Sequence, residues 1–215
     1  MSGNYELVIG NKNTSSWSLR PWLLMKALGI PFEELWIRLR RPETAAEILR
    51  HSPSGKVPAL EAGDLVVWDS LAIIEFLAER HPNVVVWPRD PEARAIARCV
   101  AAEMHSGFSA LRNEFPMDFV GTLDFPQASE SARADIARIV AIWIDCRQRF
   151  GGAGGYLFGD FSAADAMYAP VASRFTSYQV DLARFGDDGT AASYRETMMA
   201  MPEMRAWGEA ARAEI

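Results

Sequence analysis

The segment KVPALEAGDLVVWDS, residues 56–70, restricts the possible folds more than any other part of the sequence. Two short apolar runs, 57–61 and 65–68, flank an Ala-Gly-Asp turn, and this pattern predicts a β-hairpin. Apolar residues then recur at helical spacing and predict a helix over 70–80. The chain must therefore contain a β-sheet with a strand that leads directly into a helix.

Similar patterns in the preceding residues predict that strands and helices alternate. An apolar run over 5–10 indicates a buried strand, and a loosely alternating segment over 32–39 indicates a second one. Helices are predicted over 18–29 and 43–50. The predicted order over residues 1–82 is therefore βαβαββα.

The chain beyond a proline-containing connector, residues 82–91, shows helical patterns only. We therefore predict the fold class α/β plus all-α, with a small α/β domain over 1–82 and an all-helical domain over 91–215. The predicted helices of the second domain span 91–118, 129–150, 163–178, 188–200 and 202–213.

Composition limits the function. The net charge of −6 over 215 residues leaves no basic excess to neutralise phosphates, so we expect no nucleic-acid partner. No apolar stretch approaches the ~18 residues that span a bilayer and no signal peptide is evident, so we expect a cytoplasmic protein without a membrane partner. Cys99 and Cys146 are expected to be reduced thiols. Three scattered histidines offer no metal-ligand cluster, so no metal is expected.

Pro58 stands at the start of the first hairpin strand. Because proline cannot donate to a strand ladder, it belongs at a first strand position or on an edge. Two interpretations stay open. Pro58 either opens an edge strand, or follows a cis peptide bond that turns the backbone of Val57 toward a ligand.

Asp69 and Ser70 lie where the second hairpin strand passes into the helix. Ser70 is a helix-capping candidate, and a helix N-terminus also favours a carboxylate. Asp69 could receive an ammonium group. The pair therefore suits either simple capping or the end group of an α-amino acid, which carries both charges.

The stretch NKNTSSWSLRPW, residues 11–22, places adjacent hydroxyls just before the first helix. Lowering the pKa of a thiol by about two units requires roughly 2.7 kcal/mol. A hydrogen bond to a charged group supplies ~1.5–3 kcal/mol, and a helix terminus adds ~0.3–1 kcal/mol. One serine at this helix start, Ser15 or Ser16, could therefore stabilise a thiolate, although capping of the helix is the alternative.

The segment FSAADAMYAPV begins the predicted helix over 163–178. Ser162 and Asp165 have the spacing of an N-terminal capping box, with aspartate in place of the usual glutamate. We expect both residues to act in folding and to take no part in chemistry.

Together, the segments SSWSLR, GKVPAL, DSLAIIEFL and FSAADAMYAP resemble the cytosolic glutathione transferase family over essentially the whole chain. The likeness is greatest to the serine-type zeta, tau and theta classes. It implies a thioredoxin-like N-terminal domain, an all-helical C-terminal domain and a homodimer. It also implies glutathione as co-substrate and a small hydrophobic electrophile as acceptor.

The resemblance also implies roles for individual residues. Ser15 matches the serine that activates the glutathione thiol, with Ser16 as the adjacent competitor. The segment Lys56-Val57-Pro58 matches the part that pairs with the cysteinyl backbone and approaches the glycyl carboxylate. The pair Asp69-Ser70 matches residues that hold the γ-glutamyl end. For the acceptor, the resemblance implies residues of the second domain, namely Met104, His105, Phe108, Arg112 and Tyr168.

Three functions stay open at this point. The first is conjugation of glutathione to hydrophobic electrophiles. The second is cis–trans isomerisation of the maleylacetoacetate type, in which Arg20, Arg112 and Arg174 could hold two carboxylates. The third is glutathione binding without catalysis. The full zeta-class motif is absent, since Leu19-Arg20-Pro21-Trp22 replaces Trp-Arg-Val-Arg.

Overall fold

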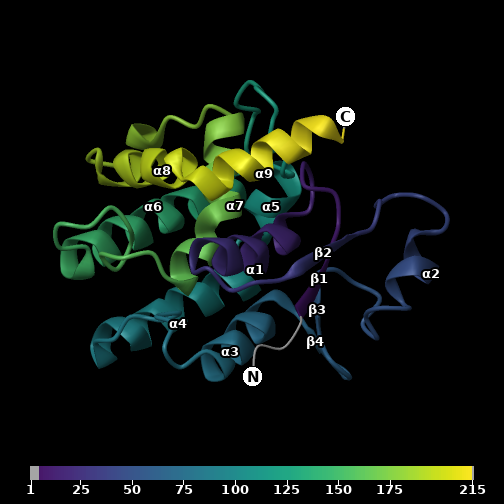
Figure 1. Ribbon diagram of the computed structural model, residues 1–215. Helices are drawn as coiled ribbons and strands as arrows, with labels where there is room; N and C mark the ends of the chain where they lie inside the picture. The colour runs from purple at the N-terminus through teal and green to yellow at the C-terminus, as the bar shows by residue number, and fades with distance from the viewer. Residues whose placement is uncertain (1–4, 215) are drawn as a thin grey trace.

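The computed structural model of the protein describes residues 5–214. Its first seven elements confirm the predicted order βαβαββα and form what we call the sheet unit (Figure 1). These elements are β1 (Tyr5–Ile9), α1 (Ser16–Ala27), β2 (Glu33–Trp36), α2 (Thr44–Ile48), β3 (Ala59–Ala62), β4 (Leu65–Trp68) and α3 (Ser70–Arg80).

The remaining helices form the helical unit. They are α4 (Pro91–Ser106), α5 (Ser109–Glu114), α6 (Glu130–Phe150), α7 (Ala163–Ser177), α8 (Thr190–Ala200) and α9 (Pro202–Ala213), with a 3₁₀ turn at Leu182–Phe185. The single helix predicted over 91–118 is wrong. It is divided into α4 and α5, because Gly107 is extended and Phe108 is left-handed with φ of 55°. No described helix is long and apolar enough to cross a membrane.

The sheet has the strand order β2-β1-β3-β4. Strand β1 is parallel to β2, whereas β3 is antiparallel to both β1 and β4. The interpretation that Pro58 opens an edge strand is therefore wrong, because the strand that follows it is paired on both sides. The Val57–Pro58 peptide bond is cis.

The two faces of the sheet bury different clusters. Leu7 and Ile9 of β1 face the main core with α1 and α3, whereas Val8 faces a small cluster that includes Ile48 of α2. This alternation is the expected consequence of a strand covered by helices on both faces. Figure 1 shows α2 projecting beyond the sheet, away from the helical unit.

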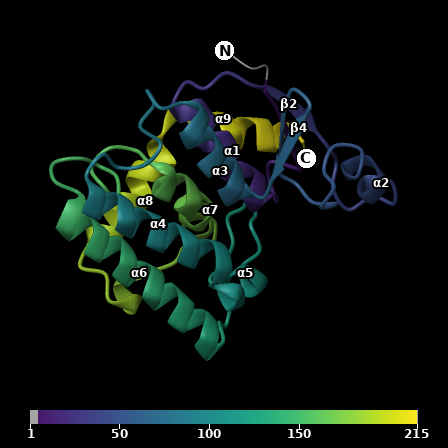
Figure 2. The same ribbon diagram turned by 90° about the horizontal axis from the view of Figure 1, so that it is seen from below.

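Helix α1 lies between the sheet and α7, and nine of its twelve residues are buried. Helix α7 packs against both α1 and α4 (Figure 2). A helix buried on nearly all sides can tolerate a charged residue only if that residue has partners. The fully buried Arg20 meets part of this need, because its Nε donates to the Met167 carbonyl at 3.1 Å and its Nη1 to the Ser16 carbonyl at 2.9 Å.

The start of α7 has the predicted capping box. The backbone N–H and the hydroxyl of Ser162 donate to Asp165 Oδ2 at 2.9 and 3.0 Å. The N–H of Leu157 donates to Asp165 Oδ1 at 3.0 Å. Asp165 is fully buried, so one carboxylate satisfies three donors that water cannot reach.

We expect Asp165→Ala to lower the free energy of unfolding by roughly 3 kcal/mol or more, because each buried donor left unpaired costs about 1–3 kcal/mol. Asp90→Ala is the matched control, since Asp90 caps α4 by accepting the N–H of Ala93 but is exposed. The control should lose about 1 kcal/mol. Urea denaturation measures both values, and equal losses would contradict the assigned role of Asp165.

Candidate functional site

The loop between β1 and α1 holds Ser15 through a chain of hydrogen bonds. The N–H of Gly10 donates to Ser18 Oγ at 3.1 Å, and Ser18 Oγ lies 2.7 Å from Ser15 Oγ. Ser15 occupies the N-cap position of α1, but its side chain makes no capping hydrogen bond. The capping interpretation of this hydroxyl is therefore wrong, because its contact is with Ser18.

A cavity of about 460 Å³ lies at the N-terminal end of α3. It is lined by all five residues predicted to hold glutathione and by two of the residues predicted for the acceptor. The lining consists of Trp17, Ser54, Lys56, Val57, Pro58, Trp68, Asp69, Ser70, His105 and Arg112. Strand pairing and the turn into α3 thus bring three separate segments of the sheet unit to one site.

The N-terminus of α3 presents a carboxylate, from Asp69, and a hydroxyl, from Ser70. Asp69 Oδ1 accepts the N–H of Leu71 at 2.8 Å, and its Oδ2 lies 2.7 Å from Nε2 of His105 on α4. Ser70 is buried, and its hydroxyl has no hydrogen-bond partner among the described residues. Because buried hydroxyls are nearly always paired, this group points to a ligand in the cavity.

A second cavity of about 340 Å³ is also lined by Trp17. Its lining includes Ser16, which does not line the first cavity. Ser15 lines neither cavity. Trp17 and Arg112 line both cavities, so the two are neighbours. The second is lined by Thr14, Ser16, Trp17, Arg112, Asn113, Pro116, Met117 and Arg174.

Arg112 and Arg174 line the second cavity, and Arg20 and Arg112 lie against the Trp17 ring. The guanidinium carbons of Arg20 and Arg112 lie 4.1 and 5.2 Å from the Trp17 ring centre. Arg174 is buried, with Nε donating to the Phe115 carbonyl at 2.8 Å. None of these arginines has a carboxylate within 4.0 Å among the described residues. The cluster is therefore a concentration of positive charge in a chain of negative net charge.

Burial and mutual repulsion affect these guanidinium groups. Burial lowers the pKa of Arg20 well below its ordinary value, and the charges of Arg174 and Arg112 lower it further. Burial and then Arg112 lower the pKa of Arg174 to about 10. Arg20 Nη2 is buried without a hydrogen-bond partner in the described part of the chain. An anion in the second cavity, which Arg112 and Arg174 line, would relieve their mutual repulsion.

The remaining acceptor candidates lie away from the cavities. Met104 and Tyr168 are fully buried, and the Tyr168 hydroxyl donates to the Val100 carbonyl at 3.2 Å. Phe108 is also buried and lines neither cavity. The structure thus corrects these three assignments, because the side chains pack in the main core and line neither cavity near Trp17.

The sequence prediction missed three lining residues of the first cavity, Trp17, Ser54 and Trp68. Trp68 is 45% exposed at the end of β4, directly before Asp69. An exposed tryptophan beside a predicted binding residue was a usable signal. Ser54 follows a loop proline and carried no comparable signal.

Glu6, His51 and Glu61 bring metal-ligand atoms within 4.8 Å of one another on the α2 side of the sheet. His51 Nδ1 lies 2.8 Å from a Glu61 oxygen. This grouping corrects the expectation that the histidines join no such cluster. Sequence spacing did not reveal it, because the pairing of β1 with β3 places Glu6 opposite Glu61. None of the three lines either cavity near Trp17.

Comparison with known proteins identifies the family. A family model described as "Glutathione S-transferase, N-terminal domain" matches residues 14–80, and one described as "Glutathione S-transferase, C-terminal domain" matches residues 126–210. The chain belongs to the glutathione S-transferase family. A maleylacetoacetate isomerase from Rattus norvegicus is 30% identical over 179 residues, covering 81% of this chain and 79% of the relative.

Further similarities agree with this family. A zeta-class glutathione S-transferase from Euphorbia esula is 29% identical over 175 residues, covering 80% of this chain and 77% of the relative. A solved glutathione transferase homolog from Burkholderia with bound glutathione has a TM-score of 0.71 at 22% identity, covering 99% of this chain and all of that chain. The predicted thioredoxin-like and helical architecture of the glutathione S-transferase fold is confirmed, and the chain is an enzyme of the glutathione transferase type.

Proposed function

We propose that the protein conjugates glutathione to small electrophiles and that a serine hydroxyl stabilises the reacting thiolate. The observation that carries this proposal is the first cavity, in which the unpaired Ser70 hydroxyl lies beside Lys56, Val57 and Asp69. The γ-glutamyl carboxylate of glutathione would meet Ser70 and the α3 N-terminus, where backbone N–H groups favour an anion. The ammonium would meet Asp69, and the glycyl carboxylate would meet Lys56.

In this proposal, Ser15 donates a hydrogen bond to the glutathione sulfur. Ser18 accepts the N–H of Gly10 and can donate its own hydrogen to Ser15 Oγ, which leaves the Ser15 hydrogen free for the sulfur. Such chains of hydrogen bonds strengthen one another. The start of α1 adds a partial positive charge near the thiolate.

The proposed reaction needs no covalent intermediate on the protein. The glutathione thiol loses its proton to solvent, and the thiolate forms a carbon–sulfur bond with the electrophile. The leaving group departs with the electron pair of the bond that breaks. The serine lowers the free energy of the thiolate, so that more of the bound glutathione is reactive at neutral pH.

We expect Ser15→Ala to lower kcat/KM for a chlorinated arene about 10–100-fold, because a hydrogen bond to a charged group contributes ~1.5–3 kcal/mol. The dissociation constant for glutathione should change little, since other groups hold its two ends. Ser18→Ala should lower kcat/KM by a smaller factor.

Ser16→Ala serves as the matched control, because Ser16 lines the second cavity without the contact to Ser18. Steady-state kinetics and glutathione titration measure all three variants. A loss of activity that appears only in Ser16→Ala would move the assignment to that residue.

A second candidate function is glutathione-dependent cis–trans isomerisation of a conjugated dicarboxylate. The arginines around the second cavity favour it, because they lack carboxylate partners in the described part of the chain. Relatives named maleylacetoacetate isomerase, at 27–30% identity, support the same chemistry. The thiolate would add to the double bond, the resulting single bond would rotate, and loss of the same thiolate would release the trans isomer.

Arg112→Gln separates the two functions, because Arg112 is only partly buried and lines both cavities. If the acceptor is a dicarboxylate, turnover of maleylacetoacetate should fall about tenfold or more, while conjugation of a neutral chlorinated arene stays within about twofold. The control is Arg205→Gln, an exposed site on α9. Equal losses on both substrates would contradict an anion-binding role for Arg112.

Two further proposals follow from family resemblance. We propose that the protein is a homodimer, and that it acts in the cytoplasm. The bounds 1–82 and 91–215 remain our proposal for the two domains, because α3 ends at Arg80 and α4 begins at Pro91.

A further inference from the structure

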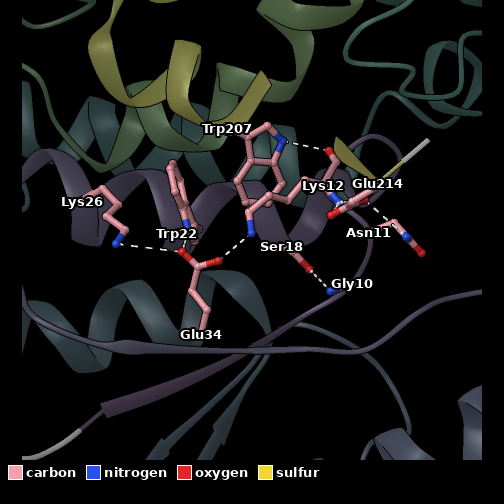
Figure 3. A network of polar contacts seen from close by, with 9 residues as sticks. All are labelled: Gly10, Asn11, Lys12, Ser18, Trp22, Lys26, Glu34, Trp207 and Glu214. Carbon is pink, nitrogen blue, oxygen red and sulfur yellow. Dashed lines mark hydrogen bonds and ion pairs between the residues drawn. The ribbon is translucent and has the colours of Figure 1, made fainter. Parts of the chain in front are cut away.

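Trp207 of α9 and Glu214, the residue directly after α9, both contact the backbone of Lys12 (Figure 3). The Lys12 N–H donates to the Glu214 carboxylate, with distances of 3.0 and 2.9 Å to its two oxygens. The Lys12 carbonyl accepts the indole N–H of Trp207 at 2.8 Å. Trp207 is fully buried, whereas Lys12 is partly buried. Trp207 and Glu214 thus hold the two peptide groups on either side of the Lys12 Cα in the loop between β1 and α1.

The Lys12 side chain ties the same loop to the sheet. Its ammonium forms an ion pair with Glu34 of β2 and lies 5.5 Å from the Trp207 ring centre. Glu34 also accepts the indole N–H of Trp22 at 2.7 Å, and Trp22 packs edge-to-face on Trp207. Partial burial opposes ionisation of Glu34, but the hydrogen bonds from Lys12 and Trp22 lower its pKa. Strand β2, α1 and α9 therefore converge on Lys12.

Asn11, the residue before Lys12, connects this part of the loop to Ser15 by a hydrogen bond. The Asn11 carbonyl accepts the N–H of Ser15 at 2.7 Å. The Asn11 side chain donates to Glu214 at 3.3 Å, and its Oδ1 accepts the N–H of Leu39 at 2.8 Å. One residue thus connects Glu214 to the backbone of Ser15.

We propose that Glu214 and Trp207 are positioning residues that hold the Asn11–Ser15 loop so that the serine hydroxyl meets the glutathione sulfur. This proposal rests on the proposed serine chemistry. A loop places a reacting group well only if its supporting contacts are rigid, and a small displacement weakens a hydrogen bond to a thiolate. Neither Glu214 nor Trp207 lines either cavity near Trp17, and the proposal assigns them no contact with glutathione.

Glu214→Ala tests the proposal because it removes both carboxylate oxygens that accept the Lys12 N–H. We expect faster hydrogen exchange at the amides of Lys12 and Ser15, and a kcat/KM lower by about tenfold at neutral pH. The pH midpoint of kcat/KM should rise, since a misplaced serine stabilises the thiolate less. The dissociation constant for glutathione should stay within about twofold, and Glu214→Gln should recover part of the activity.

Three further variants complete the experiment. Glu209→Gln, at an exposed position of α9, should behave as wild type in every measurement. Trp207→Phe keeps an aromatic ring but removes the N–H donor, and it should shift the pH midpoint in the same direction as Glu214→Ala. Ser15→Ala shows whether the pH midpoint of kcat/KM depends on the Ser15 hydroxyl.

Either of two results would overturn the positioning role. Unchanged exchange at Lys12 in Glu214→Ala would show that Glu214 does not fix the loop. Faster exchange with an unchanged pH midpoint and kcat/KM would show a structural contact without a role in positioning. An unchanged pH profile of kcat/KM in Ser15→Ala would instead reject the proposed serine chemistry. The positioning role would then fall as well, whatever hydrogen exchange is measured at Lys12.

Discussion

The burial of α1 between the sheet and α7 is the constraint on which the rest of the structure depends. It joins the two units through side-chain packing and through the hydrogen bond from Arg20 to the Met167 carbonyl. It also fixes the N-terminus of α1 beside the cavities, so that Trp17 lines both of them. The same packing that stabilises the fold therefore also places Thr14 of the preceding loop and Trp17 of α1 at the cavities.

The site combines two electrostatic environments that meet at Trp17. On one side, Asp69 and the N-terminus of α3 offer a negative group and a positive helix end, which suits the zwitterionic end of a peptide such as glutathione. On the other side, Arg112 and Arg174 offer positive charge without carboxylate partners among the described residues. The first cavity is the one in which we propose that glutathione binds, and the second offers positive charge to an anionic group of the acceptor.

Local patterns predicted most of the fold and the glutathione side of the site, because hairpin turns, helical spacing and capping residues are encoded within a few neighbours. They did not show that α4 and α5 are separate helices, since a left-handed conformation at a phenylalanine such as Phe108 is rare and no local pattern predicts it. They also did not show that Met104 and Tyr168 face the core. Helical spacing shows which side chains share a face of a helix, but not which part of the protein that face packs against. The contact between Lys12 and Glu214 joins residues 202 positions apart, and no local pattern reveals such a pair.

The central claim is that the protein lowers the pKa of the glutathione thiol. The most direct test is a pH titration of the ultraviolet thiolate absorbance of glutathione bound to the wild-type protein. We predict an ionisation midpoint about two pH units below that of free glutathione, which corresponds to roughly 2.7 kcal/mol of thiolate stabilisation. A midpoint equal to that of free glutathione, measured with the site saturated, would contradict the account.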